Sequence, residues 1–198
     1  MQDVKTTIFP IYSYGHAVLK EQAEDIPKDY EGLQDLVASM YETMYNANGV
    51  GLAGPQIGLS LRIFVIDSTQ MYEEDEKENK EEGKGVKRVF INAQKIEETG
   101  KEWDYKEGCL SIPGVSEKVT RPTTVKLRYF DENFNEYEEV FDEITARVIQ
   151  HEYDHIEGVL FTDHIGPLAK AKIRRKLKDI KNGKTKADYK MVFPKPKR

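Results

Sequence analysis

The sequence predicts an α+β fold with mostly antiparallel β-sheets around a central helix, a second helix near the N-terminus and a basic helix near the C-terminus. Two kinds of pattern support this. Over residues 124–131, apolar Val125, Leu127 and Tyr129 alternate with Lys126 and Arg128, which is typical of a half-buried strand. Residues 30–46 and 143–157 instead carry apolar side chains at helical spacing.

The first half of the chain contains the first helix and the first strands. The helix over about residues 30–46 follows Pro27 and Asp29, which are typical of a helix start. Its apolar stripe consists of Leu33, Leu36, Val37, Met40, Tyr41 and Met44. The segment Gly49–Gln56 is rich in small residues and contains a proline, so it cannot be a helix interior. It is either a tight turn before the next strand or, as Gln56 at its end favours, a glycine-rich loop whose backbone approaches a neighbour closely. Strands are expected near residues 61–67 and 88–98.

The second half is expected to contain three more strands, near residues 115–120, 124–131 and 135–141. The central helix spans about residues 143–157, where Ile144, Val148 and Ile149 supply the apolar side and Gly158 follows the end. After the Gly166-Pro167 break, a basic helix over 168–180 and a tail over 184–198 are expected.

Composition predicts a cytoplasmic enzyme formed by one domain, residues 1–198. A single cysteine excludes a disulfide framework. No apolar run is long enough to span a membrane, and no signal peptide is visible at the start. Seven acidic residues stand within 73–82, which predicts a solvated acidic loop at about 71–85.

Charge is unevenly distributed along a chain with a net charge of −5. From Lys170 onward, 13 lysines and arginines face only Asp179 and Asp188. This basic C-terminal region, about 166–198, could bind ribosomal RNA through its phosphates, although such a region is more often simply a solvated helix. Nothing in the sequence indicates recognition of specific DNA.

The segment His151-Glu152-Tyr153-Asp154-His155 is the most specific motif. On a helix, residues four apart share a face, so both imidazoles can bind one metal ion. Glu152 then lies beside the ion, where it can reach a metal-bound water as general base. The alternative is a solvated helix that happens to carry two histidines.

The third ligand expected of a common zinc protease is missing. Where a metzincin has its third histidine, this chain has Phe161, and no glutamate follows Glu157. Asp163 and His164 follow the helix too closely to fold back easily. Cys109, the only cysteine, lies in Glu107-Gly108-Cys109-Leu110-Ser111 and is the upstream candidate. A lone cysteine is usually a buried apolar residue, but one thiolate and two imidazoles would leave an open position for water.

Three segments in order therefore resemble the peptide deformylase family: Gly49–Gln56, Glu107–Ser111 and Gln150–His155. The resemblance covers roughly residues 10–165. One departure is Gly54, where the family usually has alanine; this affects loop flexibility more than chemistry. The resemblance implies a metal-dependent hydrolase that removes the formyl group from the N-terminal formylmethionine of nascent bacterial-type proteins.

The resemblance also implies roles for individual residues. Metal-bound hydroxide attacks the formyl carbon, and Glu152 takes up and returns the proton. The Gln56 amide and the Leu110 backbone N–H stabilise the oxyanion. Val50, Ile144, Val148 and the face of His151 would line the methionine pocket, while Val50, Gly51 and Gly108 pair with the peptide backbone. Glu107 is expected to pair with Arg121 and hold the Cys109 loop.

The residues alone do not identify the metal ion. Cys109, His151 and His155 suit Zn²⁺, Fe²⁺, Ni²⁺ or Co²⁺, and the resemblance implies Fe²⁺. Two rival functions remain open: a zinc peptidase with an unusual third ligand, and a ribosome-binding protein with a structural metal. Because no ligand or proposed catalytic residue lies beyond His155, deletion of residues 170–198 is expected to leave turnover of a formyl-Met tripeptide nearly intact.

Overall fold

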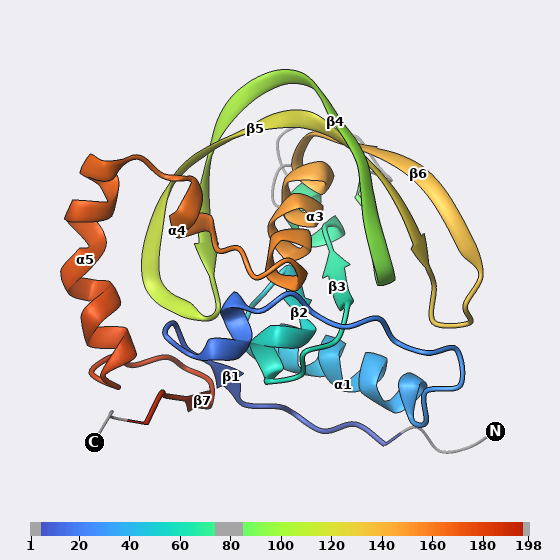
Figure 1. Cartoon of the computed structure of the whole chain (residues 1–198), viewed down its shortest axis with the longest axis horizontal. Helices are drawn as coiled ribbons and strands as arrows, with labels where there is room; N and C mark the ends of the chain where they lie inside the picture. Colours follow the sequence, from blue (N-terminus) through green and yellow to red (C-terminus); the bar gives the residue numbers. More distant parts are fainter. Residues whose placement is uncertain (1–4, 74–84, 196–198) are drawn as a thin grey trace.

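The computed structural model describes residues 5–73 and 85–195 as a five-stranded antiparallel sheet, a two-stranded sheet and five α-helices (Figure 1). The described elements, in chain order, are β1 (Ile11–Tyr12), η1 (Ala17–Lys20), α1 (Leu33–Asn46), β2 (Gly51–Ala53), η2 (Gly54–Ile57), β3 (Ile63–Asp67), α2 (Thr69–Glu73), β4 (Lys87–Cys109), β5 (Ile112–Phe130), β6 (Glu136–Asp142), α3 (Glu143–Ile156), α4 (Phe161–His164), α5 (Pro167–Lys181) and β7 (Met191–Val192). The predicted α+β class is confirmed.

The large sheet has the order β2-β3-β4-β5-β6, with every neighbouring pair antiparallel. Strand β3 is buried along its whole length because it has helices on both sides. Phe64 and Ile66 belong to the core on the α3 side, whereas Ile63 and Val65 belong to the core that contains α1. This two-sided burial explains the unbroken apolar run of the strand.

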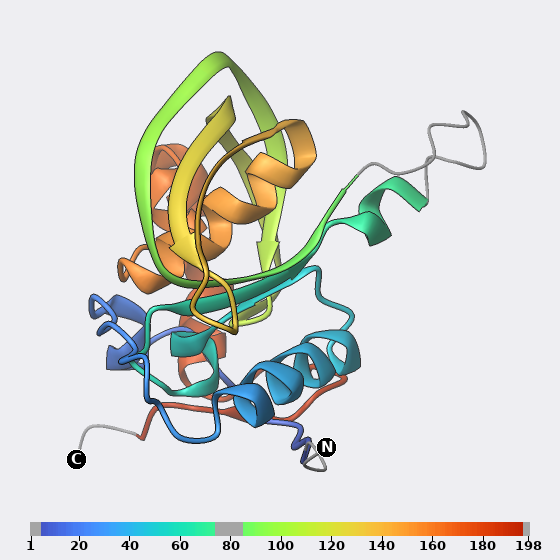
Figure 2. The same ribbon diagram turned by 90° about the vertical axis from the view of Figure 1, so that its right-hand side faces the viewer.

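Strands β4 and β5 form a long hairpin that arches over α3 (Figures 1 and 2). The predicted breaks at 98 and between 120 and 124 are wrong, because β4 continues to Cys109 and β5 is one strand from Ile112 to Phe130. Gly100 and Pro122 lie at a register shift between Thr99 and Glu102. Such a bulge accommodates residues that would weaken a regular ladder.

The Gly49–Gln56 segment has more regular structure than either the tight turn or the glycine-rich loop that its composition suggested. It contains β2, which pairs with β3, and the short 3-10 helix η2. Helix α1 begins at Leu33, after Gly32 in the left-handed conformation, rather than near residue 30. The predicted central and basic helices are present as α3 and α5.

The C-terminal region is more structured than the predicted tail. Strand β7 pairs in parallel with β1, and the Ile11 N–H donates to the Lys190 carbonyl at 2.8 Å. Two segments from opposite ends of the sequence, β1 and β7, therefore lie side by side (Figure 1). A two-residue pairing has too little pattern to be seen in the sequence.

The predicted acidic loop at 71–85 falls largely on residues 74–84, which lie outside the described residues. The part before it, through residue 73, belongs to α2. Among the described residues, no helix is both long enough and apolar enough to cross a membrane.

Candidate active site and metal centre

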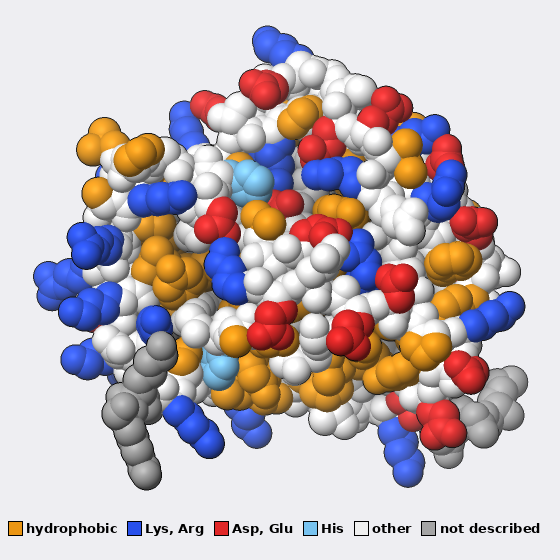
Figure 3. All heavy atoms as spheres, viewed as in Figure 1, with side chains coloured by type: hydrophobic (Ala, Val, Ile, Leu, Met, Phe, Trp, Pro, Cys, Tyr) orange, Lys and Arg blue, Asp and Glu red, His pale blue; other side chains and the backbone are white. Residues whose placement is uncertain are grey.

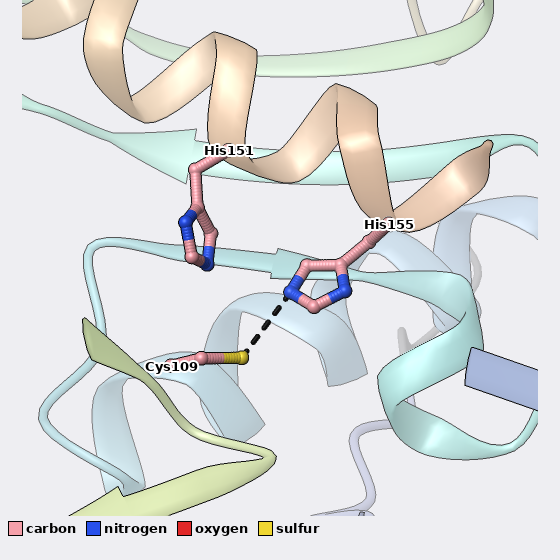
Figure 4. A group of neighbouring side chains, drawn as sticks. All are labelled: Cys109, His151 and His155. Carbon is pink, nitrogen blue, oxygen red and sulfur yellow. Dashed lines mark hydrogen bonds between the residues drawn. The ribbon is translucent and has the colours of Figure 1, made fainter. Parts of the chain in front are cut away.

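Helix α3 and the end of β4 bring the three predicted ligands together (Figure 4). His151 and His155 lie one turn apart on α3, with ring centroids 5.1 Å apart. Cys109 is the last residue of β4, and its Sγ lies 3.2 Å from Nε2 of His155. The ligand atoms of the three residues all lie within 4.8 Å of one another.

The donor set fits a single metal ion. Burial would raise the pKa of the Cys109 thiol, but His155 and His151 outweigh burial and lower it to about 5. Cys109 therefore supplies a thiolate at neutral pH, beside two imidazoles. One thiolate and two imidazoles leave a fourth position open for water, as in catalytic sites. Asp163 and His164, the alternative ligands, are absent from the cluster formed by the described residues.

Glu152 lies beside the three ligands and is buried. Its burial raises the pKa of the carboxyl to about 7. Within the described part of the chain, its Oε2 has no hydrogen-bond partner. A buried carboxylate oxygen without a partner is costly unless it meets a proton donor from the ligand or solvent.

The main chain of Gly51 on β2 packs directly against Glu152. A Cβ added at Gly51 would lie 2.7 Å from the Glu152 Cγ, so no larger residue fits without moving Glu152. Close backbone approach therefore explains this glycine.

Gln56 connects the glycine-rich segment to the metal ligands. Its Oε1 accepts the Ala53 N–H at 2.8 Å, which fixes the orientation of the side-chain amide. Its Nε2 then points toward the Cys109 Sγ, 3.5 Å away. The amide N–H groups are thus aimed at the metal centre.

Glu107 is the centre of a buried network behind the ligands. The expected pairing with Arg121 is present, with Nε and Nη2 donating at 2.8 and 3.1 Å. Arg147 donates to the same carboxylate at 2.9 Å, and Nδ1 of His151 lies 2.9 Å from it. Although burial opposes ionisation, hydrogen bonds from His151 and Arg121 hold the pKa of Glu107 well below its usual range.

Sequence reasoning missed the rest of this network. Arg121 also donates to Asp154 at 2.8 Å, and Nε2 of His164 lies 2.7 Å from the same Asp154 oxygen. A signal for Arg147 existed, because it precedes His151 by four residues and so shares its face of α3. His164 gave no such signal, since its contact depends on the path of the chain after α3.

The metal centre opens into a cavity of about 710 Å³. Most of the predicted substrate and oxyanion residues line it, namely Val50, Gly51, Gln56, Gly108, Leu110 and Val148. Ile144 is not part of this lining; it lies in a neighbouring hollow, which shares Met71 and Tyr105 with the cavity. The cavity wall also includes Lys186–Tyr189, which the sequence did not indicate.

Comparison with known proteins decides the family. The family description of polypeptide deformylase matches residues 8–171, which include the three motif segments and all three ligands. The chain belongs to the polypeptide deformylase family.

Deformylases from several bacteria match almost the whole chain. A peptide deformylase from Flavobacterium johnsoniae is 53% identical over 188 residues, covering 94% of this chain and 96% of that protein. One from Flavobacterium psychrophilum is 50% identical over 193 residues, covering 96% of this chain and 100% of the relative.

Solved deformylase structures share the fold. A peptide deformylase from Legionella pneumophila has a TM-score of 0.76 and 35% identity, covering 89% of this chain and 96% of that one. Peptide deformylase 1B from Arabidopsis thaliana has a TM-score of 0.77 and 31% identity, with coverage of 88% and 91%. The predicted resemblance is thereby confirmed in both sequence and fold.

Proposed function

We propose that this chain removes the formyl group from the N-terminal formylmethionine of nascent peptides, with Glu152 as the proton carrier. Deformylation is the activity of the family to which the chain belongs. The assignment of Glu152 depends on its buried Oε2, which lies beside Cys109, His151 and His155 and has no hydrogen-bond partner among the described residues. A general base needs this kind of position, within reach of the attacking water.

A divalent ion held by Cys109, His151 and His155 would supply Lewis acidity and lower the pKa of a bound water. In our proposal, Glu152 accepts the proton from the attacking water and then delivers it to the leaving amine nitrogen. The Gln56 amide and the Leu110 N–H donate to the formyl oxygen as negative charge develops there. Glu107 fixes the tautomer of His151 by accepting from its Nδ1, which leaves Nε2 for the ion.

The substrate would lie along the free edge of β2. This strand is at the end of the sheet that the described residues form. The Val50 carbonyl accepts from the Asp67 N–H at 2.9 Å, so the Val50 N–H and the main chain of Gly51 would pair with an added peptide strand, with Gly108 opposite. Val50, Val148 and the face of His151 line the cavity and suit an apolar methionine side chain. Ile144 is placed more peripherally, through the adjoining hollow.

We propose Fe²⁺ as the physiological ion, with Zn²⁺, Ni²⁺ and Co²⁺ as ions that the same donors accept. Anaerobic purification followed by metal analysis tests this identity directly. Thiolate and ferrous iron can both oxidise, so activity is expected to fall on exposure to air when iron is bound. An air-stable enzyme that contains only zinc would contradict the proposal for iron.

A zinc peptidase is the alternative that needs a direct test. The experiment compares formyl-Met-Ala-Ser with unformylated Met-Ala-Ser and follows both formate and free amino acids. The proposed deformylase releases formate from the first peptide and leaves both peptide backbones intact. Cleavage of Met-Ala-Ser at a comparable rate would overturn the assignment.

We also propose that the chain acts as one catalytic domain in the cytoplasm, where nascent peptides emerge. The cavity draws on residues from Asn48 to Tyr189, so the site uses most of the chain.

We further propose that the basic face of α5 docks the enzyme on the ribosome. Lysines and arginines crowd the surface over this helix (Figure 3), and Lys170, Lys172, Arg174, Arg175, Lys176 and Lys178 are all exposed. Such a surface displaces counterions from RNA, so binding weakens steeply as salt concentration rises.

The docking test replaces Arg174, Arg175 and Lys178 by glutamine. Co-sedimentation with ribosomes at low salt should fall, while turnover of formyl-Met-Ala-Ser stays unchanged. The matched control carries the same change at three exposed lysines elsewhere, Lys28, Lys101 and Lys118. Equal loss of binding in both variants would show that net charge, and not the α5 face, governs association.

A further inference from the structure

The chain returns to the catalytic cavity after α5. Residues Lys186–Tyr189 form part of the cavity wall, and β7 then pairs with β1 (Figure 1). These residues lie beyond residues 8–171, which the family description matches. A segment outside that match therefore contributes to the site.

Tyr189 makes the most direct contact between this segment and the site. Its hydroxyl donates to the Leu110 carbonyl at 2.7 Å. Its ring packs in the apolar cluster that contains Met44, Leu52 and Leu110. Burial, together with the Cys109 and Asp188 charges, raises the pKa of Tyr189 to about 12, so the hydroxyl keeps its proton at neutral pH.

The hydrogen bond from Tyr189 meets the turn that follows Cys109 and contains the Leu110 N–H. Cys109 and Ile112 pair across β4 and β5, and Leu110 and Ser111 are the two turn residues between them. Both turn carbonyls accept hydrogen bonds from residues outside the β4–β5 hairpin. Tyr189 holds that of Leu110, and the Tyr14 N–H donates to that of Ser111 at 2.8 Å.

Residues beside the two paired strands β1 and β7 therefore hydrogen-bond to the same turn. Tyr14 follows β1 and Tyr189 precedes β7, and the Ser13 N–H donates to the Val192 carbonyl at 2.9 Å. The hydrogen bonds from Tyr14 and Tyr189 thus fix the two residues that follow the Cys109 ligand. Small displacements of catalytic groups reduce rates strongly, so these two hydrogen bonds bear on turnover.

We infer that Tyr189 is a positioning residue that holds the Leu110–Ser111 turn, and with it the Leu110 N–H, in its productive orientation. This inference rests on the proposed role of the Leu110 N–H at the formyl oxygen. The hydrogen bond from the Leu110 N–H to the formyl oxygen strengthens in the transition state. Displacement of this N–H therefore lowers kcat more than it changes KM.

The test is Tyr189→Phe, which removes the hydroxyl and keeps the ring packing. Loss of one hydrogen bond that holds the turn is expected to lower kcat about fivefold, with KM within about twofold of the wild-type value. The Leu110 and Ser111 amide resonances in NMR spectra should shift. Tyr129→Phe is the matched control, since Tyr129 is buried, its hydroxyl donates to Glu139, and neither residue lines the cavity.

All variants are assayed with equal metal content and well below their unfolding temperatures. Wild-type kcat in Tyr189→Phe, with the Leu110 amide unmoved, would overturn the inference, as would an equal fall of kcat in Tyr129→Phe. Failure of the proposed function is a separate result, because the wild-type enzyme would then release no formate from formyl-Met-Ala-Ser.

Discussion

At the scale of single residues, the site depends on how closely Gly51 approaches Glu152. The proposed base is buried by neighbours that leave one of its oxygens unpaired in the described structure. Its position is therefore set by packing more than by hydrogen bonds. A methyl group at residue 51 would occupy the space of the Glu152 side chain.

Gly51→Ala is expected to lower kcat by about 10²-fold, because displacing a positioned base removes a contribution of about 10²–10⁴. Metal content should stay unchanged, since the Cβ added at residue 51 meets Glu152 first and none of the three ligands is among its nearest neighbours. Gly166→Ala is the matched control, because an added Cβ there meets nothing within 4 Å. Steady-state formate release measures both. Wild-type turnover in Gly51→Ala would show that Glu152 tolerates displacement.

At the scale of elements, one network of ion pairs behind the metal centre joins β4, β5 and α3. Glu107 is on β4, Arg121 is on β5, and Arg147, His151 and Asp154 are on α3. Arg121 and Glu107 are nearly fully buried. Because each buried charge relies on its partners, the network also fixes α3 relative to the hairpin.

Arg121→Met should destabilise the protein by about 3–5 kcal/mol, since it leaves Glu107 and Asp154 buried with fewer partners. Metal affinity should fall about 10–100-fold because His151 loses part of its support. Urea unfolding and competition with a chelator measure the two effects. Arg128→Met, at the exposed pair with Glu138, is the control and should change neither noticeably. Similar losses in both variants would mean that the buried network has no special role.

Sequence alone predicted the elements whose pattern is local. The helical spacing of Ile144, Val148 and Ile149 predicted α3, and the spacing of His151 and His155 placed both ligands on one face. The β4–β5 hairpin was divided wrongly because Gly100 and Pro122 look like breaks, whereas a bulge absorbs them. Contacts between distant segments, such as Asp154 with His164 or Tyr189 with Leu110, follow from the path of the chain and leave no local pattern.

At the scale of the whole molecule, the C-terminal region is part of the catalytic structure. The expectation that residues 170–198 could be removed with little loss rested on the absence of ligands and proposed catalytic residues beyond His155. The structure nevertheless places Lys186–Tyr189 in the cavity wall and pairs β7 with β1, which is the reason to revise that expectation. The basic residues after Lys170 give no local sign of the apolar contacts that Tyr189 makes.

Deletion of residues 183–198 is therefore expected to reduce kcat at least about fivefold, through loss of the Tyr189 hydrogen bond, and to lower thermal stability. Deletion of residues 196–198 alone is the control, since it leaves β7 and the cavity wall in place. Differential scanning calorimetry and formate release compare the two. If both truncated proteins match the full chain in each measurement, the C-terminal region has no role in the site.

The central proposal is that Glu152 carries the proton at a centre formed by Cys109, His151 and His155. The most direct measurement is kcat for formate release from formyl-Met-Ala-Ser by Glu152→Ala and wild-type enzyme, both loaded anaerobically and matched in metal content. We predict full metal binding, an unchanged fold and a loss of about 10²–10⁴ in kcat for the variant. Turnover close to the wild-type value at neutral pH would contradict the proposed role of Glu152.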